Sequence, residues 1–397
     1  MKIIAIIGGG PSALMLAAML DEKKCNVHIY EKNATVGRKF LVAGDGGFNL
    51  THSEGIESFI ARYTPHTFLE QALRAFTNQD LCMWLQSIGI ETYTGSSKRI
   101  FPLRGIKPIE VLNAILEKLK SKMVHIHTQH EWKGWDDTNA LLFQNKKETV
   151  AVKVDCTVFA LGGASWSVTG ADGTWLNLFQ QRGVQTVPFQ ASNCAYQVSW
   201  PAEFLVKHEG QWLKNVALST EGQVKCGELV VTALGLEGGP IYALSPLLRK
   251  QLLATGTAKI QLDFKPTLTK EVLLQKIHKA GNKSIANILS DDIKLTETQI
   301  ALLKVFVSKD DFLNVEKLAQ TIKSFPISIV ATAPIDDAIS TVGGIALSEV
   351  DKNFQIHKLP NQYVIGEMLD WDAPTGGYLL QGCFSMGAWV AKEMNNK

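Results

Sequence analysis

The stretch KIIAIIGGGPSALMLAAMLDEKKCNVHIYE, residues 2–31, decides the fold. Its uninterrupted apolar run over residues 2–7 predicts a strand that is buried on both faces of a parallel sheet. Three glycines end the run, Pro11 suits the first turn of a helix, and apolar residues at helical spacing follow. A second strand is expected over residues 26–30. The stretch therefore predicts a strand–turn–helix–strand unit of an α/β domain.

The turn of this unit has the spacing Gly8-x-Gly10-x-x-Ala13, which favours dinucleotide binding. Gly8 permits the tight turn, Gly10 lets a pyrophosphate approach the backbone, and Ala13 lets the helix pack closely on the strand. The first turn of the helix, with Pro11 and Ser12, offers free N–H groups and a positive dipole end to the phosphates. These residues predict the phosphate-binding part of a nucleotide site.

An acid follows the second strand at the position that this motif requires. Glu31 lies roughly 20 residues after Ala13, where its carboxylate would accept hydrogen bonds from the adenosine ribose hydroxyls and repel a 2′-phosphate. The alternative is that Glu31 is only a solvated residue at the end of a strand.

A second strand that ends in an acid, residues 363–367, lies near the C-terminus and points to FAD. Glu367 is placed to bond a ribityl or other polyol hydroxyl, and the helix after Gly376 and Gly377 would direct N–H groups at the pyrimidine edge of a flavin. The alternative is that this glycine pair is only a turn before the last helix. Because an NAD domain of this type is normally completed by contiguous repeats, we expect one FAD domain built from both ends of the chain.

Three further groups of residues are weaker candidates. Arg38 and Lys39 could bind phosphate, or they could be solvated surface charges. The glycine-rich residues 44–49 could pass close to a planar ring, or they could form an ordinary loop. His52 is a weak candidate for a catalytic acid or base, and the alternative is a structural histidine.

Composition excludes several classes of function. The chain has 397 residues and a formal net charge of +2, and it contains no run of Lys and Arg that would build a basic face, so no nucleic-acid partner is expected. It has no apolar stretch of about 18 residues and no signal peptide, which predicts a cytoplasmic protein without a membrane span. The six cysteines lie far apart without a C-x-x-C pair, so no metal site and no disulfide framework are expected.

The middle of the chain changes in character. Residues from about 187 to 262 carry strand-like runs, residues from about 268 to 324 are polar with helical apolar stripes, and strand character resumes after Pro326. This predicts a β-rich insert that contains a small helical domain and separates the two halves of the α/β domain.

Several stretches resemble those of the bacterial NAD(P)/FAD-dependent oxidoreductases, flavoproteins that include aminoacetone oxidase and a bile-acid reductase. The similar stretches are residues 8–13, Glu31 with 37–41, 46–53 (GGFNLTHS), 99–102, 160–165, 235–239 and 366–381 (GEMLDWDAPTGGYLLQ). They span nearly the whole chain, and the last one is highly specific. Within this family the chain is most similar to a subgroup without an assigned activity.

The resemblance implies a glutathione-reductase-like FAD-binding Rossmann domain, residues 1–186 and 340–397. A β-barrel-like domain, residues 187–267 and 325–339, and a helical insert, residues 268–324, would interrupt it. The candidate cofactor-binding residues are Gly8, Gly10, Pro11, Ser12, Ala13, Glu31, Lys32, Arg38, Lys39, Gly44, Gly46, Gly47, Asn49, Thr51, Ala160, Gly162, Gly163, Gly366, Glu367, Asp372, Gly376, Gly377 and Tyr378.

Two positions depart from the family pattern. Gly47 and Phe48 stand where many members carry Arg-Cys, and Asp45 stands where a small or basic residue is usual. Substrate preference is therefore not carried over from the aminoacetone and bile-acid enzymes.

The expected function is that of an FAD-dependent oxidoreductase, an oxidase or a reductase. It would transfer hydride through the flavin to or from a small organic molecule, with NAD(P)H or O2 as redox partner. Two alternatives stay open: a flavin-dependent RNA-modifying enzyme, which the near-neutral charge disfavours, and a non-catalytic flavin-binding sensor.

Overall fold

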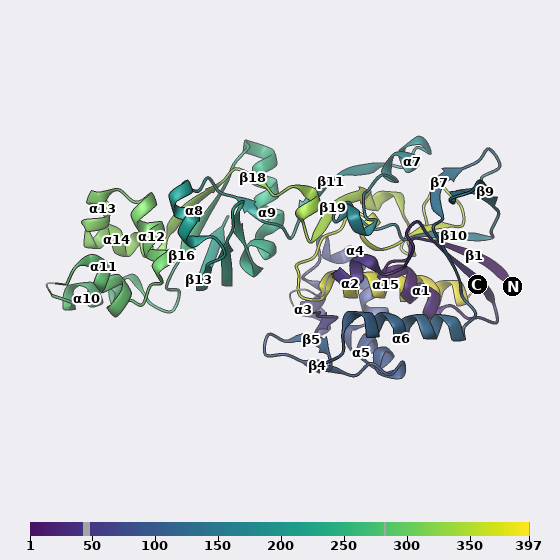
Figure 1. The fold of residues 1–397 in the computed structure, drawn as a ribbon, viewed down its shortest axis with the longest axis horizontal. Helices are drawn as coiled ribbons and strands as arrows, with labels where there is room; N and C mark the ends of the chain where they lie inside the picture. The colour runs from purple at the N-terminus through teal and green to yellow at the C-terminus, as the bar shows by residue number, and fades with distance from the viewer. Residues whose placement is uncertain (43–47, 282, 397) are drawn as a thin grey trace. The chain divides into compact units, whose positions relative to one another are not determined.

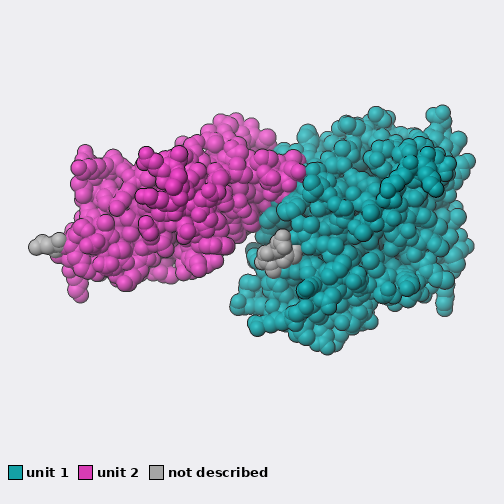
Figure 2. All heavy atoms as spheres, in the orientation of Figure 1, with its two compact units in different colours: residues 1–190, 339–397 teal, residues 191–338 magenta. Residues whose placement is uncertain are grey.

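The computed structural model describes residues 1–42, 48–281 and 283–396, and it divides into two compact units. Unit 1 combines residues 1–190 with residues 339–397, and unit 2 consists of residues 191–338 (Figures 1 and 2). Each unit has its own core of buried apolar side chains. The two units are described separately below.

The described residues of unit 1 form a five-stranded parallel sheet in the order β20-β10-β1-β2-β6. The strands are β1 (Lys2–Ile7), β2 (Cys25–Glu31), β6 (His125–Thr128), β10 (Cys156–Phe159) and β20 (Gln362–Val364). The apolar run of β1 is buried from Ile4 to Ile7, as expected for a strand between two helical layers. The parallel sheet confirms the predicted α/β class. Its central strand, β1, pairs with β2 on one side and with β10, from the middle of the sequence, on the other.

Two helices from opposite ends of the chain pack directly on each other. They are α1 (Pro11–Met19) and α15 (Tyr378–Asn395), which lie side by side in Figure 1. A Cβ on Gly387 would lie 2.5 Å from the carbonyl oxygen of Ser12 and 2.9 Å from the amide nitrogen of Leu16. The close crossing of these helices therefore depends on a glycine at this position.

The other elements of unit 1 surround this sheet. The helices are α2 (Arg38–Val42), α3 (Ile56–Ile60), α4 (His66–Ala75), α5 (Asn78–Ser87), α6 (Pro108–Ser121) and α7 (Leu176–Gln181). The short strands are β3 (Thr51–His52), β4 (Thr92–Thr94), β5 (Arg99–Pro102), β7 (Glu131–Trp135), β8 (Leu141–Gln144), β9 (Thr149–Val152), β11 (Thr186–Ser192) and β19 (Ser340–Ile345).

The strands between residues 124 and 158 are divided between two sheets. β7, β8 and β9 form an antiparallel meander, but β6 pairs in parallel with β2. The reason is the preceding helix α6, which returns the chain to the same end of the sheet, so that the next strand runs parallel to β2.

Unit 2 contains an antiparallel sheet whose described strands follow the order β17-β16-β13-β14-β15-β12-β18. They are β12 (Tyr196–Gln197), β13 (Trp212–Thr220), β14 (Gln223–Val231), β15 (Gly235–Glu237), β16 (Ala258–Asp263), β17 (Phe325–Ile329) and β18 (Ala331–Thr332). β17 and β18 are consecutive and separated by a single residue, so the order begins and ends in the same chain segment. The sheet therefore closes on itself like a small barrel.

Helices cover this sheet and build the rest of unit 2. They are α8 (Ala202–His208), α9 (Gly239–Thr255), α10 (Lys270–Lys279), α11 (Ile285–Asn287), a π-helical turn (Ile288–Asp292), α12 (Glu297–Phe306), α13 (Lys309–Leu313) and α14 (Val315–Lys323). Helices α10 to α14 occupy the stretch for which the sequence predicts helical stripes.

Candidate functional site

A cleft of about 490 Å³ opens in unit 1 at the carboxyl ends of four strands, β1, β2, β10 and β20. Its walls include the turn after β1, the acid that ends β2, and the residues that follow β10 and β20. Open parallel sheets bind ligands at this edge, where the connections after neighbouring strands diverge. The predicted residues that line the cleft are Gly8, Gly10, Pro11, Ser12, Glu31, Lys32, Arg38, Lys39, Ala160, Gly162, Gly366 and Glu367.

The three glycines of the turn after β1 have different surroundings. Gly8 has φ +99°, and a Cβ there would overlap the carbonyl oxygen of Ala160. A Cβ on Gly9 would overlap the side chain of Val36. For Gly10, by contrast, the nearest described protein atom to a Cβ would be the Ala160 oxygen, 4.0 Å away. Gly8 and Gly9 are therefore required by chain packing, whereas Gly10 leaves space on the side of the cleft.

This space lies at the N-terminus of α1. The helix begins at Pro11 without a side-chain cap from the described residues, so its first N–H groups are available to an acceptor in the cleft. A pyrophosphate fits this arrangement, because it needs both close approach to the backbone and N–H donors.

Glu31 lines the cleft and is held by three N–H donors from the described residues. Its Oε2 accepts from the Gly9 amide at 2.9 Å, and its Oε1 accepts from the Asn33 amide and from Asn33 Nδ2, both at 2.8 Å. A carboxylate has about four acceptor sites. One site, on Oε2, is therefore left for a ribose hydroxyl, and the binding of the adenosine ribose by Glu31 stays a prediction.

The residues that follow β20 reach the same cleft from the other end of the chain. Gly366 has φ +78°, and a Cβ there would lie 2.6 Å from Ser12 Oγ. Lys39 Nζ lies 3.2 Å from Glu367 Oε2 and donates to Ser165 Oγ at 3.0 Å. Residues more than three hundred positions apart in the sequence thus line one cleft.

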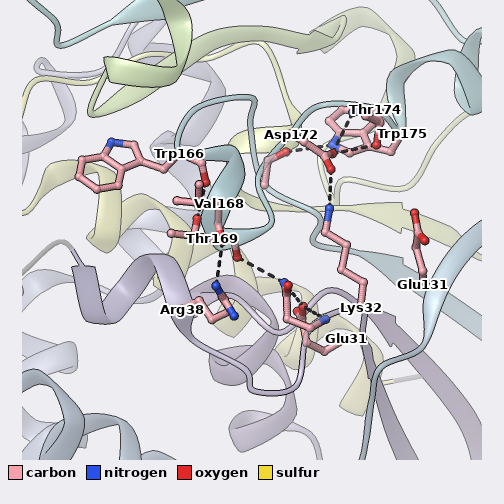
Figure 3. Close-up of polar contacts among 12 residues, drawn as sticks. Glu31, Lys32, Arg38, Glu131, Trp166, Val168, Thr169, Asp172, Thr174 and Trp175 are labelled. Atoms are coloured by element: carbon pink, nitrogen blue, oxygen red, sulfur yellow. Dashed lines mark hydrogen bonds and ion pairs between the residues drawn. The ribbon is translucent and has the colours of Figure 1, made fainter. Parts of the chain in front are cut away.

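A strap, which we define as residues 165–172, lies against the turn that follows β2 (Figure 3). Arg38 Nη2 donates to the carbonyl oxygen of Val168 at 2.8 Å, and Lys32 Nζ pairs with Asp172 Oδ2 at 2.6 Å. Burial works to raise the pKa of Asp172, but the hydrogen bonds from Lys32 and Thr174 outweigh it and lower the pKa. Arg38 and Lys39 thus have protein partners, and their binding of phosphate stays a prediction.

A second group of predicted residues meets where α15 begins. A Cβ on Gly377, which has φ +98°, would lie 2.5 Å from Thr51 Cα, and one on Gly376 would lie 3.2 Å from Arg99 Nε. Tyr378 follows as the first residue of the helix. The structure brings Thr51, Gly376, Gly377 and Tyr378 together, but none of these four residues lines the cleft described above.

The remaining predicted residues have other positions. Ala13 is buried, Gly163 packs against the Thr341 side chain, and the buried Asp372 forms a backbone bridge with Thr64. Asn49 lies two residues before β3. Four residues named in the sequence analysis lie outside the described residues, so their roles stay predictions: Gly44, Asp45, Gly46 and Gly47.

Tyr378 takes part in a half-buried polar network beside β3. Its hydroxyl donates to Glu54 Oε1 at 2.6 Å, and Arg62 donates to both carboxylate oxygens at 3.1 and 2.9 Å. Burial works to raise the pKa of Glu54, but the hydrogen bonds from Arg62 and Tyr378 outweigh burial and lower it. Burial first, and then the bond to Glu54, raise the pKa of the Tyr378 hydroxyl.

The His52 ring lies in the same network. It stacks on Tyr378 with 5.3 Å between ring centroids, and its Nδ1 accepts from the Glu54 amide at 3.2 Å. Burial lowers the pKa of His52, against the influence of Glu54 and of a hydrogen bond to the Ser97 backbone. These contacts are typical of a structural histidine, and a role as acid or base stays a prediction.

Glu54→Gln should destabilise the protein in a pH-dependent way. The folded pKa of Glu54 is below its ordinary value of 4.5, so its stabilising effect is complete above that pH and disappears as pH falls through the folded pKa. At neutral pH we expect the free energy of unfolding to fall by about 1 to 3 kcal/mol, because a neutral amide replaces a charged acceptor. Chemical denaturation at a series of pH values measures this difference.

The difference between Glu54→Gln and the natural protein should shrink at acidic pH. Glu57→Gln is the matched control, because this side chain is also paired with an arginine but is 76% exposed, so its loss should change stability little. A destabilisation by Glu54→Gln that persists unchanged at low pH would contradict the assignment of this ion pair.

Sequence reasoning missed several residues of the cleft, among them Asn33, His130, Trp132, Asp172 and Trp175. Asn33 had a recognisable pattern, because Asn just after a strand commonly bonds the neighbouring backbone and side chains. Asp172 had none, since its partner Lys32 lies 140 positions away in the sequence.

The described residues form neither a metal-binding cluster nor a membrane-spanning helix. Among them, no group of three or more His, Cys, Asp and Glu side chains is placed to hold a metal ion. None of their helices has both the length and the apolar character needed to cross a membrane.

Known proteins are similar to the chain over nearly its full length. It is 24% identical to the 3-dehydro-bile acid delta(4,6)-reductase of Clostridium scindens, covering 98% of this chain and 97% of the relative. It is 22% identical to the ribosomal RNA dihydrouridine synthase of Haemophilus influenzae, covering 96% and 95%. The solved 3-ketosteroid delta1-dehydrogenase of Sterolibacterium denitrificans shares its fold, with 11% identity, full coverage of both chains and a TM-score of 0.50.

FAD fits the cleft as the residues shape it. The space beside Gly10 and the free N–H groups at the start of α1 match a pyrophosphate. The open acceptor site on Glu31 and the second carboxylate, on Glu367, match hydroxyl groups of a flavin dinucleotide. The model of the HI0933-like protein Rossmann domain matches residues 2–393, and the chain therefore belongs to this family of FAD-dependent oxidoreductases.

Proposed function

We propose that this FAD-dependent oxidoreductase reduces a carbon–carbon double bond that is conjugated to a carbonyl group in a small organic molecule. The observation that carries the flavin chemistry is the single cleft lined by both ends of the chain, with Gly10 and Glu31 from one end and Glu367 from the other. The bond that is reduced is inferred from the relatives.

The residues of the cleft bind and orient the cofactor in this proposal. The N-terminus of α1 binds the pyrophosphate, and Glu31 accepts one ribose hydroxyl. Glu367 accepts a hydroxyl of the ribityl chain, and Lys39 holds its carboxylate in place. Bound FAD supplies the hydride transfer, so the chain needs no nucleophile of its own for the chemistry.

The names of two relatives describe related reactions. A 3-dehydro-bile acid delta(4,6)-reductase saturates double bonds that are conjugated to a ring ketone. A dihydrouridine synthase saturates the uracil double bond, which is conjugated to a ring carbonyl. Each such reduction adds one hydride and one proton, and a reduced nicotinamide nucleotide is our proposed source of the electrons. The two reactions share an electron-poor double bond, which accepts hydride at the carbon farther from the carbonyl group.

The second candidate is reduction of uridine within RNA. The similarity to a ribosomal RNA dihydrouridine synthase over 96% of this chain favours it. The formal net charge of +2 gives little electrostatic attraction for a polyanion, so we place the small molecule first.

The first test concerns the cofactor. The purified protein should show the absorbance of oxidised flavin, and denaturation should release FAD in about one equivalent per chain. A colourless protein that also fails to take up added FAD would refute the proposal.

The second test concerns the substrate. Under anaerobic conditions NADH or NADPH should bleach the flavin, and an α,β-unsaturated ketone, such as a 3-keto-4-ene steroid, should restore its absorbance. The saturated ketone of the same skeleton is the matched control and should leave the flavin reduced. If only a uridine-containing ribosomal RNA restored the colour, and did so less efficiently as salt was raised, the second candidate would replace the first.

A further inference from the structure

Asn33 lies in the turn after β2, two residues beyond Glu31, and it lines the cleft. We infer that Asn33 is a positioning residue, which holds the Glu31 carboxylate in the orientation that the adenosine ribose requires and ties it to the strap. The inference rests on the proposed nucleotide site, and it concerns what fixes this carboxylate rather than what the carboxylate binds.

Asn33 supplies two of the three described donors to Glu31. Its backbone amide and its Nδ2 both donate to Oε1 at 2.8 Å, so this oxygen is fully occupied. The Gly9 amide bonds Oε2 at 2.9 Å and leaves one lone pair there. Because both oxygens are held, the carboxylate cannot rotate freely, and its open lone pair keeps a fixed direction.

The Asn33 side chain also contacts the strap. The same Nδ2 that bonds Glu31 donates to the carbonyl oxygen of Thr169 at 3.3 Å. An amide NH2 has two protons, and both are used here, one on each side. Asn33 therefore connects the carboxylate to a segment about 140 residues further along the chain.

Gly170 lets the backbone of the strap approach the Asn33 side chain closely. It has φ +107°, and a Cβ there would lie 2.5 Å from Asn33 Nδ2 and 3.2 Å from the Lys32 side chain. Glycine is the residue that allows both this backbone conformation and this close approach. A larger residue would displace the amide that holds Glu31.

The neighbouring ion pair between Lys32 and Asp172 holds the strap less strongly. Lys32 and Asp172 lie 2.6 Å apart, but their side chains are 27% and 31% exposed. Pairs of this exposure contribute little to stability and are screened by salt. Asn33, which is uncharged and bonded on both sides, is the better candidate for coupling the strap to the carboxylate.

The test measures FAD dissociation constants of the full chain from the change in flavin fluorescence on binding. Asn33→Ala should weaken FAD binding about tenfold, the effect of losing one hydrogen bond to a charged group. Asn145→Ala is the matched control, because Asn145 also bonds its own turn, with Oδ1 accepting from the amides of Lys147 and Glu148, but it does not line the cleft. This variant should leave FAD affinity unchanged.

A double-mutant cycle shows whether Asn33 acts through Glu31. Once Glu31→Ala has removed the carboxylate, the further change Asn33→Ala should cost almost nothing in FAD affinity. If Glu31→Ala does not fold, as judged by circular dichroism, Glu31→Gln serves as the background, because one amide oxygen cannot accept all three donors. A merely structural role of Asn33 would instead give the same loss in both backgrounds, and that result would overturn the inference.

Gly170→Ala tests the strap independently. It should weaken FAD binding in the natural background and have almost no effect on binding beside Glu31→Ala. Gly183→Ala is its control, because Gly183 has φ +73° while none of the described atoms lies within 4 Å of its would-be Cβ.

The outcomes separate this inference from the proposed function. If the natural protein binds no FAD, both are refuted. If the natural protein binds FAD tightly and Asn33→Ala binds it equally well, the positioning role is refuted and the proposed function stands.

Discussion

Gly10→Val should give a folded protein that binds FAD at least roughly 100-fold more weakly than the natural chain. A Cβ at residue 10 would lie 4.0 Å from the Ala160 oxygen, and Gly10 has an extended backbone with φ −82° and ψ 179°, so neither a backbone clash nor backbone strain opposes a side chain here. The valine occupies the space through which a pyrophosphate reaches the N-terminus of α1. Flavin absorbance per chain, together with the melting curve of the flavin-free protein, measures both parts of this prediction.

Gly8→Ala is the informative comparison. Its methyl group would overlap the carbonyl oxygen of Ala160, and its φ of +99° is unfavourable for alanine, so this variant should lose stability itself. A Gly10→Val protein that retained stoichiometric flavin would show that the phosphates are not bound at this turn.

Gly387→Ala should lower the free energy of unfolding by about 1 to 3 kcal/mol, and Gly387→Leu by more. The new side chain would meet backbone atoms of α1, the Ser12 oxygen at 2.5 Å and the Leu16 nitrogen at 2.9 Å, and backbone atoms cannot move aside alone. Separating α1 from α15 would also shift Ser12 away from Gly366, so FAD affinity should fall together with stability. Chemical denaturation and flavin titration measure the two effects.

Gly55→Ala is the control for this second prediction. Gly55 precedes α3 in an extended conformation, and the described residues place no atom within 4 Å of its would-be Cβ. Its replacement should leave stability nearly unchanged. Equal effects of Gly387→Ala and Gly55→Ala would mean that the two terminal helices do not pack as closely as the structure shows.

The local elements of this fold could be predicted from the sequence because each has a pattern of its own. A buried strand requires a continuous apolar run, as in β1, and a packed helix requires apolar residues at helical spacing, as in α1. These requirements, like that of the glycine turn between them, concern only a few adjacent residues. The parallel pairing of β6 with β2 could not be predicted in this way, because periodicity identifies a strand but not the sheet that it joins.

The cleft was predictable only in part. Gly10 and Glu31 belong to a motif with fixed spacing, and both line the cleft. The strap could not be foreseen, because its contacts with the turn after β2 join segments about 140 residues apart. The bonds of Asn33 to Glu31 are local and could have been predicted, whereas nothing in the local pattern connects Asn33 to Thr169.

The position of β20 and α15 in unit 1 has a consequence for biosynthesis. Glu31 leaves the ribosome 336 residues before Glu367, an interval of about 17 to 67 s at ordinary rates of translation. Throughout that time the nascent chain lacks one wall of its cofactor cleft, while residues 191–338, which form a compact unit with its own core, can already fold. Flavin capture should therefore be a post-translational event, and prematurely terminated chains should carry no flavin.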